Sequence, residues 1–316
     1  MSDKINSGEI LKSLEMYDLD ISNFLPEHKG PKLVLNFNKI STISEVEGVI
    51  LKGHEIENGV IADIIIKEGT VLEEPIHLCF GVNKETGLQE IFPRIIAEDN
   101  SSVTLQAHCS FPNAKNLIHK MFGHIYIGKN CKFVYNETHF HGYTGGATVA
   151  PVSYVYVGEN SYFENNFFLT QGTIGRMKIQ IDIYAFKDSV INSNVKAFGK
   201  NSLDSIRVRD AVFLEGENAR SIIKMKAAAI GGGEVMMFGI TEGNAANTTG
   251  HVDCTEIVKD RGSRCRAIPL IRATDESCHI THEASLGKVD SAQLNALMAR
   301  GLDEDEATDL IIKNML

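Results

Sequence analysis

Most of the chain after its first 30 residues consists of short runs in which apolar and polar residues alternate. In the clearest run, residues 177–184, the odd positions are Met or Ile and the even positions are Lys, Gln, Asp and Tyr. Residues 33–38 alternate in a similar way. Because successive side chains of a strand point to opposite faces, such runs predict β-strands with one buried face.

A turn pattern, Gly-X-Asn-small-X-X, separates these runs. Its copies begin at Glu98, Gly128, Gly158, Phe186, Gly199 and Gly216, with weaker copies at Gly231, Asp260 and Thr274. Successive copies are 30, 30, 28, 13, 17, 15, 29 and 14 residues apart, which is close to 30 or to half of it. Gly, Asn and Asp tolerate the left-handed backbone that tight corners need. This spacing predicts coils with two main strands and two corners each.

The fourth position of the pattern is small in every copy but one. It is occupied by Ser101, Cys131, Ser161, Ser189, Ser202, Ala219, Glu234, Ser263 and Ser277. Small residues are expected where successive coils stack closely on one another. A β-sandwich would place its turns at shorter and less regular intervals. A left-handed β-helix would show a hexapeptide period, which the chain lacks. We therefore predict a mainly β protein, a parallel β-helix over residues 31–287.

Helical segments are predicted at both ends. In residues 1–30, Ile10, Leu14, Tyr17 and Ile21 recur at helical spacing. In residues 288–316, Asp290 with Gln293 and Asp303 with Glu306 have capping-box spacing. The expected apolar faces of these two short helices are Leu294, Leu297 and Met298, followed by Ala307, Leu310 and Ile311. These helices either fold back on the β-helix or dock another protein, and the pattern fits both.

Composition limits the partners of the chain. It has 316 residues and a formal net charge of −10, with 31 Lys and Arg against 41 Asp and Glu. Such a balance argues against nucleic acid and against an anionic membrane surface. The first residues lack the basic start and apolar run of a signal peptide. We expect a cytoplasmic protein, in which the six cysteines are core packing or chemically active thiols rather than disulfides.

Side chains that bind metals gather near the end of the repeat region. Residues 251–283 contain three of the six cysteines and three of the 11 histidines. Thiolate, imidazole and carboxylate groups are iron ligands. The sixth position of the turn pattern is apolar in early copies but Cys265 and His279 in the last two. The candidate metal ligands are Cys265, His282 and Glu283, with Cys254, Cys278 and His279 as further candidates.

Other chemistry-bearing residues carry weaker signals. Cys79 and Cys109 are interpreted as core packing, and the phase of Cys109 points it inward. His139 and His141 would face the same way on a strand and could share a metal, but we favour a structural or surface role. The chain has no Walker A motif and no Gly-X-Ser-X-Gly elbow. We therefore expect a protein that is not an enzyme, with any ATP hydrolysis in another chain.

Two stretches carry a resemblance to a known family. The run from His282 through Leu294 and the stretch from Ala299 to Ala307 resemble the SufB/SufD family of iron–sulfur cluster assembly scaffolds. In that family a His-Glu-Ala-Thr or His-Gly-Ala-Thr segment precedes a helix, and an Arg-Gly-Leu-X-Glu-Glu-Ala stretch follows. Asp253-Cys254 and Arg264-Cys265 also resemble its paired cysteine segments. The resemblance is specific over residues 250–312.

The resemblance implies a right-handed parallel β-helix flanked by small helical segments. It also implies a SufC-like ABC-type ATPase docked on the C-terminal helices and a dimer formed through the ends of the β-helix. Cys265 matches the cysteine of the family's cluster site, His282 its histidine, and Glu283 the acidic neighbour in the SufB branch. The chain is shorter than a typical SufB or SufD and has features of both branches, which suggests a homodimer.

The resulting hypothesis is a scaffold on which iron–sulfur clusters are assembled transiently and from which they are transferred. A heterodimer with a homologous partner stays open. Two other hypotheses also stay open. One is a metal-free structural adaptor for an ATPase. The other is a β-helix carbohydrate-active enzyme, which the absence of Trp and of a secretion signal disfavours.

Overall fold

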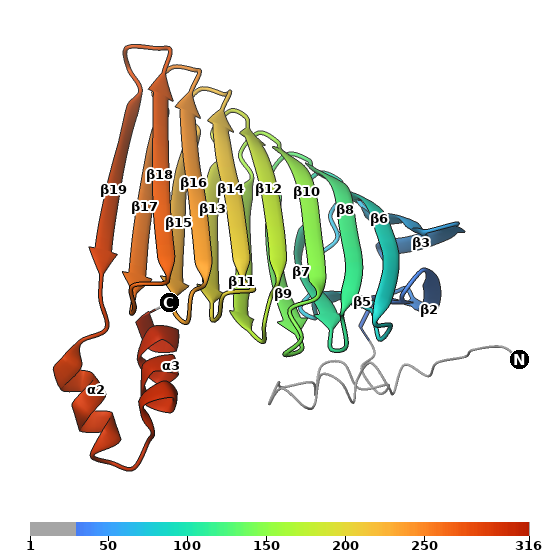
Figure 1. Ribbon diagram of the computed structural model, residues 1–316. Coiled ribbons are helices and arrows are strands. Elements are labelled where there is room, and N and C mark those ends of the chain that lie inside the picture. The colour runs from blue at the N-terminus through green and yellow to red at the C-terminus, as the bar shows by residue number, and fades with distance from the viewer. Residues whose placement is uncertain (1–29, 316) are drawn as a thin grey trace, which may run out of the picture.

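The computed structural model describes residues 30–315, and they form a parallel β-helix with two long walls (Figure 1). The expected helix within residues 1–30 lies outside the described residues. The chain alternates between the walls, so strands that are neighbours in a wall are two apart in sequence. Almost all of these neighbours pair in parallel, as in Cys109 with His139 and Thr138 with Phe168. The parallel β-helix predicted from the repeat is confirmed.

Wall A has ten strands. In spatial order they are β19 (His279–Gly287), β17 (Thr249–Val258), β15 (Arg220–Ala229), β13 (Val190–Gly199), β11 (Tyr162–Gln171), β9 (Lys132–His141), β7 (Ser102–Phe111), β5 (Ile76–Gly81), β1 (Lys32–Asn36) and β2 (Lys39–Ser44).

Wall B has nine strands. They are β18 (Arg264–Ala273), β16 (Glu234–Gly243), β14 (Ser205–Leu214), β12 (Arg176–Ala185), β10 (Ala147–Val157), β8 (Asn116–Ile127), β6 (Thr86–Ala97), β4 (Gly59–Ile66) and β3 (Val49–Ile56). The inward side chains of both walls are mostly Leu, Ile, Val and Phe and form one continuous core.

The corners explain the turn pattern of the sequence. Asn100, Asn130 and Asn160 have positive φ angles of 62°, 55° and 57°, which Asn tolerates because its side chain bonds locally. Their amides also form a ladder between coils, with Asn130 Nδ2 3.1 Å from Asn100 Oδ1 and Asn160 Nδ2 2.8 Å from Asn130 Oδ1. The copies at Gly199, Gly231 and Asp260 lie at the opposite row of corners, which accounts for the half-period intervals.

The small-residue column is the buried row of the first set of corners. Its members are Ser101, Cys131, Ser161, Ser189, Ala219 and Thr248, all at most 3% exposed. Pairing of Thr249 with His279 places Cys278 next in this column, one residue later than the sequence pattern indicated. The inward position of the last coil is therefore Ile280, beside Gly250. The expectation that His279 replaces a core residue is wrong, because it points to the outer face.

The two ends of the β-helix differ. At the N-terminal end, antiparallel pairing of β1 with β2 and of β3 with β4 finishes the coil, and Leu33, Val49 and Leu51 are at most 3% exposed. At the other end, β18 and β19 are edge strands of the described chain. The inward residues Cys265 and Ala267 of β18 are only partly buried. We call this second end the open end.

Two helices follow the last strand, α2 (Ser291–Met298) and α3 (Glu304–Met315). Both capping predictions are confirmed: Asp290 accepts from the Gln293 N–H at 2.8 Å, and Asp303 and Glu306 exchange hydrogen bonds at 2.8 and 3.0 Å. Helix α3 packs on the outer face of wall A, where Ile312 contacts the cluster of Phe198, Ala228 and Ile257. Neither helix is long and apolar enough to span a membrane.

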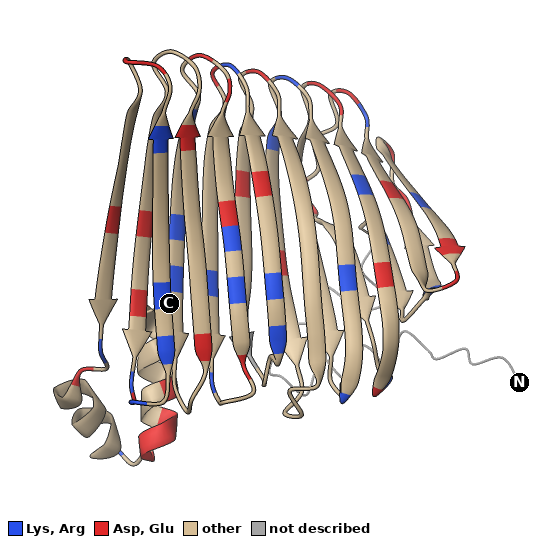
Figure 2. Ribbon diagram, turned by 45° about the horizontal axis from the view of Figure 1, so that its top comes forward, with Lys and Arg blue, Asp and Glu red and all other residues tan. Residues whose placement is uncertain are grey.

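The expected apolar face of α3 needs one correction. Ala307 and Ile311 are buried as predicted, but Leu310 is 42% exposed. The buried face consists of Ala307, Thr308, Ile311 and Ile312. Lysines of the β-helix also hold α3 in place: Lys200 lies 2.9 Å from Asp309, and Lys259 lies 3.1 Å from Glu304. The acidic first turn of α3 is visible in Figure 2. Helix α2, in contrast, has no buried residue.

Candidate functional site

Two inward rows of the β-helix end in possible metal ligands at the open end. In wall B the paired residues Ile206 and Val235 are succeeded by Cys265. In wall A the paired residues Ile223 and Val252 are succeeded by His282. Paired residues of parallel strands point to the same side, so both side chains lie on the inner side of the last coil. The structure thus places Cys265 and His282 where core residues stand elsewhere and where the described chain leaves the end uncovered.

Cys265 is half-buried and lines a surface depression. The depression has a volume of about 430 Å³, and its lining includes Arg207, Arg264, Arg266 and Leu286. The Cys265 thiol donates to the Ile257 carbonyl at 3.5 Å. Burial, and then the charge of Glu256, raises the pKa of Cys265 to about 12. The free thiol is therefore protonated at neutral pH, and a bound cation would be needed to hold it as a thiolate.

Glu256 is a carboxylate that sequence reasoning missed. It follows Cys254 on the inner face of β17, since it pairs with the inward Ala227. Its carboxylate accepts a hydrogen bond from the backbone of Ala267 across the coil, and burial raises its pKa. Its other oxygen, Oε1, is buried without a hydrogen-bond partner. The signal available in the sequence was its place in the alternation with Val252 and Cys254, an acid in a core-facing row.

Cys254 lies one coil layer below the last strand of wall A and is 1% exposed. Burial, followed by the charges of Glu256, Asp253 and Asp210, raises its pKa to about 11. Because Glu256 acts on both Cys254 and Cys265, these three groups share one region beneath the open end.

The other candidates lie elsewhere. Glu283 pairs with Asp253 and therefore points to the outer face of wall A, opposite to His282. His279 pairs with the exposed Thr249 and also points outward. Cys278 occupies the corner column, where its sulfur accepts from the Thr248 hydroxyl at 3.0 Å and its thiol donates to the Ala245 carbonyl at 3.4 Å. Cys131 lies in the same column nearer the N-terminal end, and its thiol likewise donates to a carbonyl, that of Glu98, at 3.2 Å.

A second group of metal-type ligands lies deep inside the β-helix. Within residues 30–315, one set of three His, Cys, Asp or Glu side chains has its ligand atoms within 4.8 Å of one another: Cys109, Glu137 and His139. We call these residues the interior cluster. They are 0%, 5% and 1% exposed. The candidates at the open end do not form such a set in the described chain.

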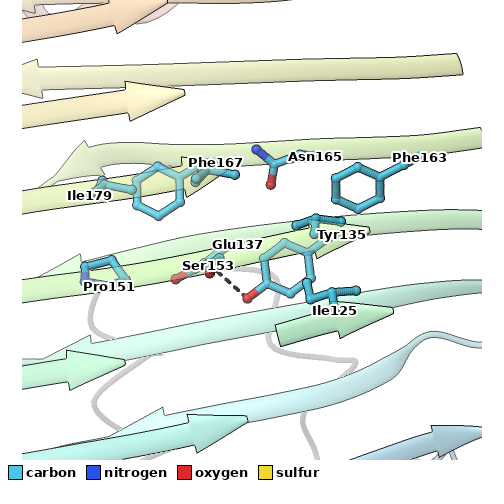
Figure 3. A pocket seen from close by; sticks show the side chains of 11 residues that line it. Ile125, Tyr135, Glu137, Pro151, Ser153, Phe163, Asn165, Phe167 and Ile179 are labelled. Atoms are coloured by element: carbon cyan, nitrogen blue, oxygen red, sulfur yellow. Dashed lines mark hydrogen bonds between the residues drawn. The ribbon is translucent and has the colours of Figure 1, made fainter. Parts of the chain in front are cut away.

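The strand pairing assembles the interior cluster. Cys109 of β7 pairs directly with His139 of β9, and Glu137 lies two residues before His139 on the same inner face. His139 Nε2 is 2.7 Å from Glu137 Oε1, and the Tyr135 hydroxyl donates to Glu137 Oε2 at 2.9 Å. Figure 3 shows Tyr135 and Glu137 facing the space between the walls, with Asn165 beside Tyr135 on the neighbouring strand of wall A.

The sequence predicted the orientation of Cys109 and of the two histidines His139 and His141. The inward orientation of Cys109 and the shared face of His139 and His141 are confirmed. A surface location for the two histidines is wrong, since both are 1% exposed. Their convergence with Cys109 could not be read from one strand, because it depends on the 30-residue register between β7 and β9.

Comparison with known proteins agrees with this architecture. Residues 82–315 match the family model described as SUF system FeS cluster assembly, SufBD core domain. An iron-sulfur cluster assembly SufBD family protein of Methanocaldococcus jannaschii is 40% identical over 316 residues, covering 100% of this chain and 99% of its own. A SufBD family protein of Pyrococcus horikoshii is 33% identical over 322 residues, covering 100% of this chain and 96% of its own.

A more distant SufBD family protein, from Staphylococcus epidermidis, is 24% identical over 262 residues, which is 80% of this chain and 54% of that protein. The full-length matches and the family model agree with the resemblance found in the sequence. The chain belongs to the SufBD family of iron–sulfur cluster assembly proteins.

Proposed function

We propose that this chain is a scaffold on which an iron–sulfur cluster is assembled at the open end and from which it is transferred. The observation that carries the proposal is the replacement of core residues by Cys265 and His282 at the uncovered end of two inward rows. Thiolate and imidazole side chains ligate iron in clusters. Cys254 and Glu256 lie beneath the same end and would complete or support the ligand set.

The cluster is cargo in this proposal, and the incomplete site suits release. A cluster that must stay in place is usually held by four cysteines. Here one chain offers one half-buried thiol and one exposed imidazole at the open end. Glu283 lies on the outer side of the edge strand β19. It would become a ligand only if the cluster binds at the outer edge of this strand.

A second copy of the chain would supply the remaining ligands. Strands β18 and β19 are unpaired on one side, and unpaired edges favour association. The open end also exposes the inward-facing Ile271 and Leu286, by 39% and 71%. We propose a homodimer through this end, with the two cluster sites at the interface. The substitution Leu286→Arg should shift the protein to monomer in analytical ultracentrifugation, whereas the same change at the distant exposed Tyr143 should not.

The energy for release would come from a SufC-like ABC-type ATPase bound to helix α2. Helix α3 is anchored on wall A, whereas α2 has no buried residue and its Leu294, Leu297 and Met298 remain available. The substitution Met298→Asp should abolish copurification of the ATPase encoded by the same organism. Ala292→Asp, which adds the same charge to the opposite, exposed face of α2, should preserve it.

The proposal is tested by anaerobic reconstitution with iron and sulfide, followed by iron analysis, sulfide analysis and cluster transfer to an apo-ferredoxin. Wild type should bind and transfer a cluster, and Cys265→Ser and His282→Ala should lose both. Cys131→Ser is the matched control, because serine already occupies the equivalent corner positions Ser101 and Ser161. Normal assembly and transfer by Cys265→Ser and His282→Ala would refute the proposed site. A colourless protein in every case would favour the metal-free adaptor.

A further inference from the structure

The interior cluster is separate from the open end. Cys109, Glu137 and His139 lie on β7 and β9, whereas Cys265 and His282 lie on β18 and β19. Between β9 and β19, wall A contains the four strands β11, β13, β15 and β17. The interior cluster is therefore too far from the open end to share one metal ion with it, and its function requires its own explanation.

Three observations point to a bound ion in the interior cluster. The three side chains offer one thiol, one carboxylate and one imidazole within 4.8 Å of one another. Nδ1 of His139 is buried and has no hydrogen-bond partner among residues 30–315. Both ring nitrogens of His141 are also buried without one, in a ring stacked 6.0 Å from that of His139. A buried polar atom without a partner destabilises a protein, so such atoms usually mark a missing water or ion.

We propose that Cys109, Glu137 and His139 bind one divalent first-row transition-metal ion, Zn²⁺ or Fe²⁺, inside the β-helix. Thiolate, carboxylate and imidazole together suit this class of ion and not Mg²⁺ or Ca²⁺, which require oxygen ligands. Metal–ligand bonds of about 2.0–2.3 Å place tetrahedral ligand atoms about 3.3–3.8 Å apart. The present spacing needs only a small opening of the contact between Glu137 and His139.

Charge balance favours the same ion. A bound metal ion requires Cys109 as a thiolate, Glu137 as a carboxylate and His139 as a neutral imidazole. The two negative charges of the thiolate and the carboxylate neutralise a divalent cation, which is what a low-dielectric interior requires.

The surroundings hold the ligands in place. The Tyr135 hydroxyl donates to Glu137 Oε2, and burial raises the pKa of Tyr135 well above its usual value, so it stays a donor. Phe111 and Phe167 pack on His139 with ring centroids 6.1 and 5.1 Å away. A cavity of about 10 Å³ beside Tyr135 and Glu137 holds one water-sized particle (Figure 3).

The test uses the full chain expressed in medium supplemented with Co²⁺, so that the ion can enter while the protein folds. Wild type purified anaerobically without sulfide should contain cobalt and show the absorption of a thiolate–Co²⁺ bond. Cys109→Ser and His139→Gln should lose this absorption and about one equivalent of cobalt. Tyr135→Phe should bind cobalt about 10–100-fold more weakly, as expected for loss of a group that orients a ligand.

Controls separate this site from the proposed cluster site. Cys265→Ser and Cys131→Ser should keep the thiolate–Co²⁺ absorption unchanged. Should cobalt depend on Cys265 and not on Cys109, the interior assignment would be wrong while the scaffold proposal would stand. If Cys109→Ser fails to fold, two other measurements still test the proposal. His139→Gln should lose the cobalt, and X-ray absorption of the wild-type protein should show one sulfur ligand. Zn²⁺ and Fe²⁺ competition against bound Co²⁺ identifies the preferred ion, and absence of cobalt from wild type would overturn the proposal.

Discussion

The interior cluster and the open end contain similar ligand types in opposite settings. Cys109, Glu137 and His139 are at most 5% exposed, and their ligand atoms already converge. Cys265 and His282 are partly or fully exposed, and the described chain does not bring them together with a third ligand. Both settings arise on the inner faces of the walls, and further coils cover the interior cluster on both sides whereas the described chain ends at Cys265 and His282.

This difference matters because enclosure controls release. An ion inside the β-helix can leave only when the walls separate, whereas a cluster at an uncovered edge can leave when a partner moves. Convergent ligands favour retention, and ligands shared across a separable interface favour transfer. One fold can therefore provide both a permanent site and a transient one.

The largest expected effect separates the two sites by their kinetics. After loading, a chelator should remove the cluster from the open end within minutes and should leave the interior metal bound until the protein unfolds. Iron release followed at the cluster absorption and metal analysis of the protein after the challenge measure both. Equal release rates would remove the distinction drawn here.

The second prediction concerns the two thiols. Below its pKa of about 12, Cys265 should be alkylated about tenfold faster for each unit of pH between 7 and 10, because only the thiolate reacts. Cys109 should remain unmodified until unfolding. Glu256→Gln removes the negative charge that helps to raise the pKa of Cys265 and should accelerate its alkylation. Peptide mass spectrometry measures each site, and early modification of Cys109 would show that the interior is open.

The third prediction tests whether α3 is anchored beside the open end. Ile312→Ala removes a fully buried contact with Phe198, Ala228 and Ile257 and should weaken docking of α3 by about 2–5 kcal/mol. Hydrogen exchange of the α3 amides should rise accordingly. Leu310→Ala, at a 42% exposed position on the same helix, should change exchange little. Equal effects of the two variants would contradict the observed docking face.

The fourth prediction concerns a buried acid in the region between the two sites. Burial raises the pKa of Asp210 from 3.8 to about 6, although Ser193 donates to it at 2.6 Å. A raised acid pKa means that its stabilising contribution is complete below about pH 3.8 and is lost as pH rises through about 6. When pH is raised from 3.5 to 7.5, the free energy of unfolding of wild type should fall by about 3 kcal/mol relative to that of Asp210→Asn, which lacks the titrating carboxyl. Denaturant titrations at both pH values measure this difference.

The sequence predicted the coil and its corners because each depends on local chemistry. Asn100 and Asn130 fit left-handed corners, small residues such as Ser101 fit the stacked column, and alternation predicts the inner rows. The capping residues Asp290 and Asp303 were likewise readable, since a cap involves residues three apart. Such features repeat along the chain, so each copy supports the others.

The sites were harder to predict because they depend on register between coils. The turn pattern placed the last corner one residue too early. His279 was therefore predicted to point inward, whereas the structure has Ile280 in that position. Glu256 was missed because its contact, the Ala267 backbone, lies across the coil. Cys109 and His139 are 30 residues apart in sequence, and only the pairing of β7 with β9 makes them neighbours.

The most direct test of the proposed assembly site is the Mössbauer spectrum of the chain reconstituted anaerobically with ⁵⁷Fe and sulfide, together with the proposed ATPase partner. Wild type and Cys131→Ser should show the same cluster, and Cys265→Ser should lack it. Loss in Cys265→Ser alone would assign the open end as the assembly site. A cluster of unchanged spectrum in Cys265→Ser would contradict the assignment.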